Sequence, residues 1–426
     1  MDRIVITGGK PLHGSITISG AKNAALPLMA ASILTSESIV LANVPHLADI
    51  MTMAHLLINH GVSFSVDGVS LSQSPTGRVI LLNGEHIKNL EAPYDIVRKM
   101  RASILVLGPL VARFGYARVS LPGGCAIGAR PIDLHLSALK QMGAEVELDC
   151  GYIEVKSKGR LKGAEIHFNF VSVGATENIL MAATLAEGRT ILHNVAREPE
   201  ISDLIKLLNA MGAKISGIGT STLTIDGVDR LSGAYHTVVC DRIEAGTYAV
   251  AAVITGGEII LENVDYEVCS NILDRLCIVG AKISVNGNQV TIKSKGIKSA
   301  RDINTGVFPG FPTDMQAQFM SLLAVAAGTS IITENIFENR FMHVPELNRM
   351  GAKISLIGNS ATIVGVSELR GAEVMATDLR ASVSLVLAGL VAEGKTLINR
   401  VYHIDRGYER IEHKLSQCGA DIKRIH

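Results

Sequence analysis

The feature that most constrains the fold of this 426-residue chain is a short motif that recurs six times. Each copy is an amphipathic stretch, a glycine and then a run in which apolar and polar residues alternate. The glycines stand at positions 61, 143, 212, 280, 351 and 419, between 68 and 82 residues apart. A glycine after a helical pattern and before a strand pattern is expected to end the helix in a left-handed conformation. The sequence therefore predicts six copies of one supersecondary unit.

A second marker accompanies each copy: an alanine- and leucine-rich helix, a turn and then a strand. These markers span residues 24–44, 102–119, 175–195, 245–264, 315–336 and 381–401. Because the helices are apolar nearly all round, we expect each of them to be deeply buried. Each unit then has the order strand, strand, helix, strand, helix, which is an α/β fold class.

Six such units exceed what one compact core accommodates and indicate two similar domains of three units each. We expect the first domain to cover residues 22–239. The second would combine residues 1–21 with residues 240–426, with the boundary near Cys240. The first twenty residues would supply the strands that the last unit lacks, so that both ends of the chain join the second domain.

The composition argues against several classes of partner. Lysine plus arginine equals aspartate plus glutamate, at 40 each, so no overall charge attracts nucleic acid or a membrane surface. The 6 cysteines and 13 histidines show no metal-ligand spacing, and we predict neither a metal nor a cofactor. The longest uncharged run, residues 315–333, contains two glutamines and favours a buried helix over a membrane span. A cytoplasmic protein without a signal peptide is the simplest interpretation.

One joint of the repeat is longer than the others. The distance from the second marker to the glycine is 15 to 18 residues in five units and 24 in the second unit. The surplus is the loop 121–131, which contains three glycines, two prolines, Cys125 and Arg130. A cysteine on such a loop near positive charge is either a reactive thiol or an incidental surface residue. An insertion at a single joint of a repeat favours function.

Polar and charged residues occupy the starts of the alanine-rich helices: Lys22-Asn23, Arg98-Lys99 with Arg101, Ser172, Asp241-Arg242, Thr313-Asp314, and Asp378 with Arg380. A basic residue at a helix start opposes the helix dipole unless an anion lies in front of it, although a solvated helix start is the simpler alternative.

Arginines recur at the strand-to-helix joints as Arg130, Arg197, Arg340 and Arg406, and arginine suits phosphate and carboxylate. Together these residues favour a cleft for a multiply anionic ligand. Arg406 can equally pair with Asp405 or Glu409. His135 and His403 flank these joints and have either a structural or a functional role.

Five motifs, at residues 20–23, 122–131, 311–318, 338–343 and 403–408, resemble the UDP-N-acetylglucosamine 1-carboxyvinyltransferase family. The resemblance covers the whole chain. It implies an inside-out α/β barrel of two three-unit domains around a cleft. It also implies transfer of the enolpyruvyl group of phosphoenolpyruvate to the 3′-hydroxyl of UDP-N-acetylglucosamine, with release of phosphate through a tetrahedral ketal. This is the first committed step of bacterial peptidoglycan synthesis, and hence of cell-wall growth, cell shape and division.

The resemblance also implies roles for residues. Cys125 would be the general acid at C3 of phosphoenolpyruvate, could carry a 2-(S-cysteinyl)pyruvic acid O-phosphothioketal adduct and would be alkylated by fosfomycin. Asp314 would be the base near the 3′-hydroxyl, and Lys22 and Arg406 complete the catalytic set. Phosphoenolpyruvate would bind Lys22, Asn23, Arg130, Arg340, Arg380 and Arg406. UDP-N-acetylglucosamine would bind Asn23, Arg101, Arg130, Pro131, Ile132, Asp133, Leu134, Phe170, Val171, Ser172, Val173, Asp314 and Ile336.

One of these positions departs from the family pattern. Relatives often have a lysine where this chain has Phe170, so a cationic contact to the diphosphate would be absent here. Two other functions stay open. One is enolpyruvyl transfer to shikimate 3-phosphate, against which the cysteine loop argues. The other is a non-catalytic nucleotide-sugar-binding protein, which needs neither Cys125 nor Asp314. The oligomeric state is not predicted.

Overall fold

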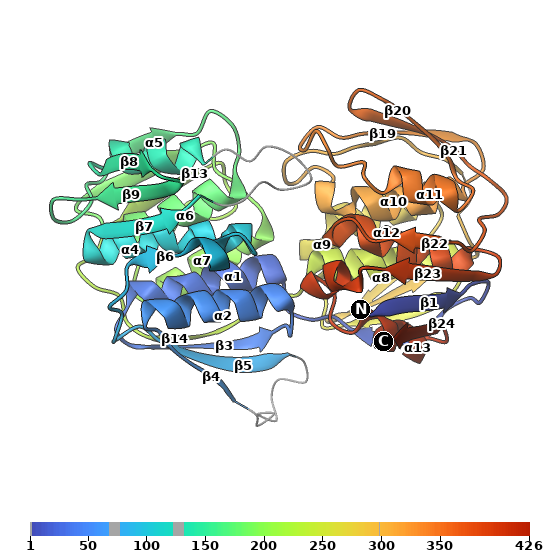
Figure 1. Ribbon diagram of the computed structural model, residues 1–426, viewed down its shortest axis with the longest axis horizontal. Helices are drawn as coiled ribbons and strands as arrows, with labels where there is room; N and C mark the ends of the chain where they lie inside the picture. Colours follow the sequence, from blue (N-terminus) through green and yellow to red (C-terminus); the bar gives the residue numbers. More distant parts are fainter. Residues whose placement is uncertain (1, 68–76, 122–131, 298) are drawn as a thin grey trace. The chain divides into compact units, whose positions relative to one another are not determined.

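The computed structural model describes residues 2–67, 77–121, 132–297 and 299–426. The described chain divides into two compact units. One unit runs to Ser19 and resumes from Cys240 to His426; we call it the C-terminal unit. The other, the N-terminal unit, comprises the described residues between Gly20 and Val239. In Figure 1 the N-terminal unit is blue to green, and both chain ends lie with the yellow-to-red elements of the C-terminal unit.

The N-terminal unit contains three four-stranded sheets, in the orders β14-β3-β5-β4, β6-β7-β9-β8 and β10-β11-β13-β12, among its described residues. Its strands are β3 (Ser38–Val44), β4 (Ser63–Asp67), β5 (Arg78–Asn83), β6 (Glu91–Ala92), β7 (Tyr116–Ser120), β8 (Glu145–Asp149), β9 (Tyr152–Lys156), β10 (Glu165–His167), β11 (Arg189–His193), β12 (Lys214–Ser216), β13 (Thr222–Asp226) and β14 (Ala234–Thr237). Its helices are α1 (Lys22–Ala30), η1 (Ala31–Leu34), α2 (Ala48–His60), α3 (Tyr94–Val97), η2 (Arg101–Val106), α4 (Leu107–Phe114), α5 (Asp133–Gln141), α6 (Val173–Thr184) and α7 (Pro199–Ala210).

The described residues of the C-terminal unit also form three four-stranded sheets, in the orders β16-β17-β15-β2, β18-β19-β21-β20 and β22-β23-β1-β24. Its strands are β1 (Arg3–Thr7), β2 (His13–Thr17), β15 (Glu258–Glu262), β16 (Lys282–Asn286), β17 (Gln289–Lys293), β18 (Ile303–Asn304), β19 (Thr329–Thr333), β20 (Lys353–Ile357), β21 (Ser360–Val364), β22 (Glu373–Met375), β23 (Lys395–Asn399) and β24 (Asp421–Ile425). Its helices are α8 (Arg242–Thr255), α9 (Tyr266–Ile278), η3 (Thr313–Met315), α10 (Gln316–Ala324), α11 (Val344–Arg349), α12 (Leu379–Val391), η4 (Val401–Arg406) and α13 (Ile411–Gln417).

All six sheets are mixed in the same way. An outer strand runs parallel to its neighbour, and the other two pairings are antiparallel, as in β10-β11-β13-β12. Each unit of the repeat therefore has one strand more than the sequence predicted. The additional strands are the parallel ones, such as β6 and β18, and these two have only two residues each. Strands this short contain too few residues to show an alternating pattern.

The first residues of the chain belong to two different sheets. β1 lies between β23 and β24, where the last unit lacks a strand of its own, and it buries Ile4 and Ile6 completely. Figure 1 shows this blue strand among red ones. β2 instead pairs in parallel with β15, in another sheet. Only β1, and not the whole segment, therefore completes the last unit.

The repeat marker has the predicted conformation in all six copies. The six glycines have φ values of 106° (Gly61), 89° (Gly143), 100° (Gly212), 107° (Gly280), 93° (Gly351) and 93° (Gly419). A side chain at these angles would be strained, which explains why glycine ends each helix. The prediction from the sequence pattern is confirmed.

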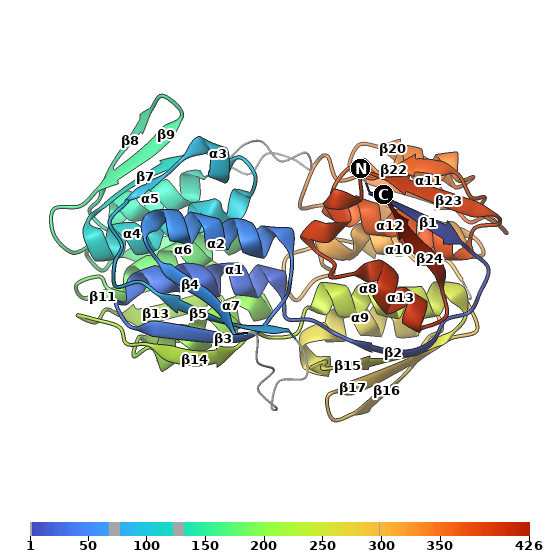
Figure 2. The ribbon, with the colours of Figure 1, turned by 60° about the horizontal axis from the view of Figure 1, so that its bottom comes forward.

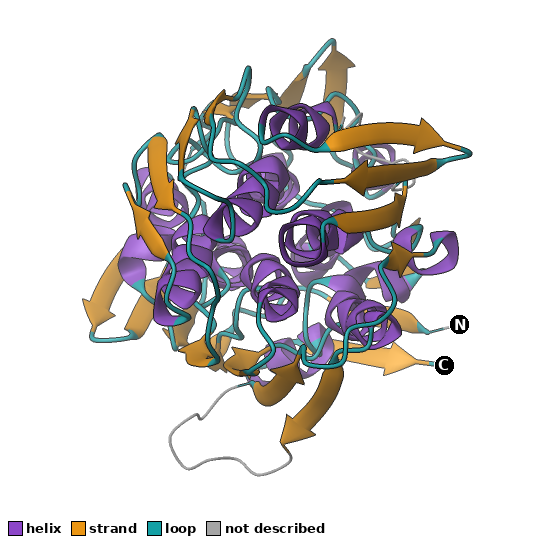
Figure 3. Ribbon diagram, turned by 90° about the vertical axis from the view of Figure 1, so that its left-hand side faces the viewer, coloured by secondary structure: helices purple, strands orange, loops and turns teal. Residues whose placement is uncertain are grey.

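The helices form the core and the sheets surround it. In α8, all residues except the last are buried, and α12 is nearly as well covered. The strands bury only alternate residues, so each sheet has one face on the helices and one in solvent. Figures 2 and 3 show the sheets outside the helices, for example β14-β3-β5-β4 along one side of the N-terminal unit. The predicted burial of the alanine-rich helices is confirmed. No helix among the described residues is both long and apolar enough to cross a membrane.

Candidate active site

The predicted site residues lie at helix starts and in the loops beside them. In the N-terminal unit, Lys22 and Asn23 begin α1, Arg101 begins η2, and Ser172 is the N-cap of α6. In the C-terminal unit, Asp314 lies in η3, Arg380 is the second residue of α12, and Arg406 ends η4. Ile336 and Arg340 lie between β19 and α11. Cys125, Arg130 and Pro131 lie outside the described residues.

The C-terminal unit brings three of these residues into contact. The Asp314 carboxylate lies between two guanidinium groups: Oδ1 is 2.6 Å from Nη2 of Arg340, and Oδ2 is 3.2 Å from Nη2 of Arg380. The two arginines are only 6% and 4% exposed, whereas a quarter of the Asp314 side chain is open to solvent. Asp314 is thus a partly exposed carboxylate, accessible to a ligand, and the buried cations Arg340 and Arg380 lie on either side of it.

The loop that carries Arg340 is organised by a buried glutamate. The Nη1 group of Arg340 donates to the Thr313 hydroxyl at 2.9 Å, and that hydroxyl donates to Glu334 Oε2 at 2.9 Å. The other oxygen of Glu334 accepts from the Thr305 hydroxyl and from the backbone N–H of Ile336, both at 2.9 Å. Glu334 therefore fixes both Arg340 and the predicted nucleotide-sugar residue Ile336. No local sequence pattern marks Glu334 as part of the site.

A second buried network supports Arg380. The Asp378 carboxylate caps α12 by accepting from the backbone N–H of Arg380 at 2.8 Å, and the guanidinium lies 3.4 Å from the Tyr408 hydroxyl. That hydroxyl is 2.9 Å from the Thr247 hydroxyl and 3.3 Å from Nε2 of Gln318. Gln318 also donates to the backbone carbonyl of Asp314 at 2.9 Å. Gln318 and Tyr408 belong to the sequence motifs, but this network was not predicted.

Burial and neighbouring charges set the protonation of this network. Burial by itself lowers the pKa of Arg380, but Asp314, Tyr408 and Asp241 more than offset it, so the pKa is raised and the guanidinium keeps its charge. Burial raises the pKa of Tyr408, which therefore remains a neutral phenol. Within the described part of the chain, the Nε atoms of Arg340 and Arg380 are buried without a hydrogen-bond partner. Buried donors normally have a partner, so these two atoms favour an additional acceptor at the site.

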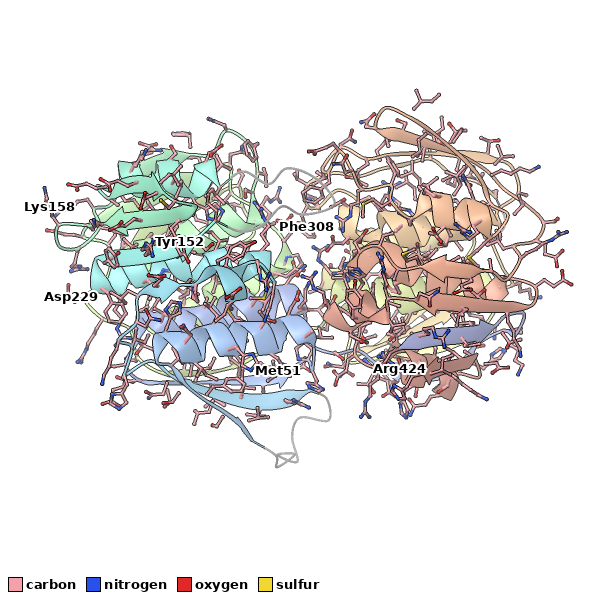
Figure 4. All side chains as sticks on the ribbon, viewed as in Figure 1. Met51, Tyr152, Lys158, Asp229, Phe308 and Arg424 are labelled. Carbon is pink, nitrogen blue, oxygen red and sulfur yellow. The ribbon has the colours of Figure 1, made fainter. Side chains whose placement is uncertain are left out.

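The sequence left two simpler explanations for the basic residues: a solvated helix start, and an ion pair between Arg406 and Asp405 or Glu409. Lys22 is 8% exposed, with its Nζ 3.4 Å from Asp49 Oδ2, so neither Lys22 nor Arg380 begins a solvated helix. Asp405 pairs with Arg424, whose Nη2 is 2.5 Å and Nη1 3.0 Å away. Figure 4 labels Arg424, which lies on β24. Asp405 thus has a strong partner other than Arg406.

Two buried histidines near the cations are neutral. The pKa of His135 is lowered to about 4 by burial and, secondarily, by Arg101. Its Nδ1 accepts from the Asn178 amide at 2.9 Å, which ties α5 to α6. Burial also lowers the pKa of His343 to about 4, because the nearby Asp378 only partly offsets burial and Arg340 adds to it. Neither histidine is in the imidazolium form near pH 7, so neither contributes a positive charge to the site.

The helix start at Ser172 has a local structural role. Its hydroxyl accepts from the backbone N–H of Ala175 at 3.3 Å, which is an N-cap of α6. Phe170, two residues earlier, is half exposed and presents an apolar ring where a lysine was expected from the family pattern.

Residues 6–415 match the family described as EPSP synthase (3-phosphoshikimate 1-carboxyvinyltransferase). The chain is 60% identical, over its full length and 99% of the relative, to a UDP-N-acetylglucosamine 1-carboxyvinyltransferase of Paramagnetospirillum magneticum. It is 58% identical to one of Granulibacter bethesdensis, with both chains fully covered. Among solved structures, the enolpyruvyl transferase NikO from Streptomyces tendae matches with a TM-score of 0.86 at 23% identity, covering 99% of this chain and 98% of NikO.

The NikO match concerns the fold alone, and it confirms the predicted enolpyruvyl transferase fold. The relatives at 58–60% identity confirm the resemblance that the sequence motifs indicated. This chain therefore belongs to the EPSP synthase family of enolpyruvyl transferases and, within it, to the UDP-N-acetylglucosamine 1-carboxyvinyltransferases.

Proposed function

We propose that this enzyme transfers the enolpyruvyl group of phosphoenolpyruvate to the 3′-hydroxyl of UDP-N-acetylglucosamine and releases phosphate, as the first committed step of peptidoglycan synthesis. The observation that carries the proposal is the 60% identity over the whole chain to a UDP-N-acetylglucosamine 1-carboxyvinyltransferase. The described cysteines are free thiols, which is consistent with the cytoplasm as the site of the reaction.

The reaction divides into an addition and an elimination. In the addition, the sugar oxygen attacks C2 of phosphoenolpyruvate, its proton leaves to a base, and C3 gains a proton, which gives a tetrahedral ketal. In the elimination, C3 loses a proton and the C2–O bond to phosphate breaks. We assign the base to Asp314, whose partly exposed carboxylate is held by Arg340 and Arg380. We assign the donor at C3 to Cys125, the thiol that fosfomycin would alkylate.

The proposed roles of the cations follow from their burial. The ketal carries a phosphate and a carboxylate, and fixed positive charges in a water-poor site stabilise such an intermediate. Arg340 and Arg380 are fixed by Thr313 and Tyr408, and each has a buried Nε donor to offer. Lys22, Asn23, Arg130 and Arg406 would complete the phosphoenolpyruvate site.

The proposed contacts of the nucleotide sugar are Asn23, Arg101, residues 130–134, residues 170–173, Asp314 and Ile336. Asn178 connects several of these elements. Its amide nitrogen donates to His135 Nδ1 at 2.9 Å and to the carbonyl of Ile104 in η2 at 3.0 Å, and its Oδ1 accepts from the N–H of Gly108 at 2.6 Å. With Phe170 in place of a lysine, diphosphate binding would depend on the other cations.

The proposal is tested by an acceptor-dependent phosphate-release assay. We expect phosphate to appear when phosphoenolpyruvate and UDP-N-acetylglucosamine are both present, and the rate to be unchanged by EDTA. Reactions that lack either substrate are the controls. Turnover with shikimate 3-phosphate in place of the nucleotide sugar would instead assign the activity named in the family description. Binding of the nucleotide sugar without any turnover would favour a non-catalytic protein.

A further inference from the structure

Two histidines and a glutamate gather on the outer face of the sheet β10-β11-β13-β12. Glu165 and His167 are two residues apart on β10, so their side chains leave the same face of the strand. His193 lies on β11, directly opposite His167 in the parallel register. The two imidazole rings are stacked, with centroids 4.2 Å apart and planes inclined by 12°. All three side chains can be reached from solvent.

The ligand atoms of this trio have the spacing of a coordination shell. Glu165 Oε1 is 3.0 Å from Nε2 of His193 and 3.7 Å from Nε2 of His167, and all three ligand atoms lie within 4.8 Å of one another. Zinc bonds to imidazole and carboxylate are about 2.1 Å long, so neighbouring ligand atoms of a tetrahedral ion are about 3.4 Å apart. The two distances from Glu165 Oε1 to the histidine nitrogens, 3.0 and 3.7 Å, lie on either side of this expected separation.

A hydroxyl on the next strand orients one of the imidazoles. Nδ1 of His193 lies 3.3 Å from the hydroxyl of Thr222 on β13. If that nitrogen carries the ring proton, Nε2 presents its lone pair toward Glu165. Outer hydrogen bonds of this kind fix the tautomer of metal-binding histidines.

A simple ion pair does not account for the arrangement. Glu165 and His193 alone would form one, but His167 would then be unexplained. Its Nε2 faces the same carboxylate oxygen at 3.7 Å, which is too long for a hydrogen bond, while its ring stacks on His193. A small cation between the three atoms accounts for both distances.

We propose that Glu165, His167 and His193 form a binding site for a divalent transition-metal ion, with Zn²⁺ as the preferred ion and water in the fourth position. Two imidazoles and a carboxylate suit Zn²⁺ better than Mg²⁺ or Ca²⁺, which prefer oxygen ligands. The ion would join the short outer strand β10 to β11 and thereby stabilise the N-terminal unit. None of the three residues has a proposed role in enolpyruvyl transfer, so the site is independent of the reaction.

The test is an isothermal calorimetric titration with ZnCl₂. The full-length protein is first treated with EDTA and dialysed. We expect one ion at this site, and His167→Ala and His193→Ala each to weaken its binding by at least about tenfold. The matched control is His13→Ala. His13 is an exposed histidine on β2, the corresponding parallel strand of another sheet, where it faces Glu258 rather than a second histidine. The control should bind as the unaltered protein does.

A second measurement distinguishes this site from the thiols. Co²⁺ should give the visible spectrum of nitrogen and oxygen ligation, without the intense charge-transfer band of a thiolate ligand. Zn²⁺ should raise the melting temperature of the unaltered protein and of His13→Ala, but not that of His193→Ala. No binding, a thiolate spectrum, or equal affinity in the two histidine variants and the control would each overturn the proposal.

Discussion

Asp314 is held both through its side-chain carboxylate and through its backbone carbonyl. Its carboxylate oxygens accept from Arg340 and Arg380, while its backbone carbonyl accepts from Gln318. The side chain is therefore held in one orientation by two buried cations, and a quarter of it remains open to solvent. A carboxylate held in this way is preorganised, so it can take a proton from a hydroxyl without first losing conformational entropy.

Asp314→Asn should therefore lower kcat by about 10²–10⁴-fold, because an amide cannot take the proton of the 3′-hydroxyl. The measurement is steady-state phosphate release, with circular dichroism to verify the fold. Asp302→Asn is the matched control: this exposed aspartate of the same unit accepts from the backbone N–H of Ile331 and has no proposed catalytic role. A kcat within tenfold of the unaltered enzyme in Asp314→Asn, while Asp302→Asn is normal, would contradict the assignment.

The buried helices pack so closely that some positions admit no side chain at all. Gly108 lies in α4, and a Cβ atom there would be 2.3 Å from the backbone oxygen of Asn178 in α6. The same residue of α6 also binds Gly108 through its side chain, because Asn178 Oδ1 accepts from the Gly108 N–H. The helix–helix contact that positions His135 thus depends on the absence of one methyl group.

We expect Gly108→Ala to destabilise the N-terminal unit by roughly 1–3 kcal/mol through overpacking, despite the better helix propensity of alanine. Urea unfolding measures the loss. Gly174→Ala is the control, because a Cβ atom at this position in the first turn of α6 would meet only the His135 ring, at 3.7 Å and beyond. The helix-packing argument would be wrong if the two variants were equally stable.

In the whole molecule, the two ends of the chain are joined in one sheet. β1 pairs with β23 and with β24, so Ile4 lies opposite Ile398 on one side and Arg424 on the other. Its side chain is fully buried, whereas the adjacent Val5 is on the opposite, partly exposed face. The C-terminal unit is therefore complete only when the beginning of the chain has docked onto its end.

Ile4→Ala should destabilise the C-terminal unit by about 2–5 kcal/mol, because it leaves a cavity beneath the sheet. Hydrogen exchange followed by mass spectrometry should become faster in β23 and β24 and remain unchanged in β3–β5 of the N-terminal unit. Val5→Ala, one residue away on the other face, should leave the exchange of β23 and β24 nearly as it was. Equal acceleration in both variants would show that the buried face of β1 does not hold the sheet.

The sequence by itself determined the repeat, the α/β class and the helix ends, because these depend on local patterns. The spacing of apolar residues distinguishes a helix from a strand. The end of each helix can be recognised from the glycine that its positive φ requires. The motifs likewise sufficed to identify the family. They also predicted Asp314, Arg340 and Arg380 as site residues, and the role of Cys125 remains a prediction.

Only the tertiary structure decided which of these residues meet. Asp314 contacts arginines 26 and 66 positions further along the chain, and β1 lies beside strands from the opposite end. Glu334, and the grouping of Glu165 and His167 with His193, were missed for the same reason. Such contacts depend on sheet register and on the packing of buried helices, which bring together residues that no local pattern relates to one another.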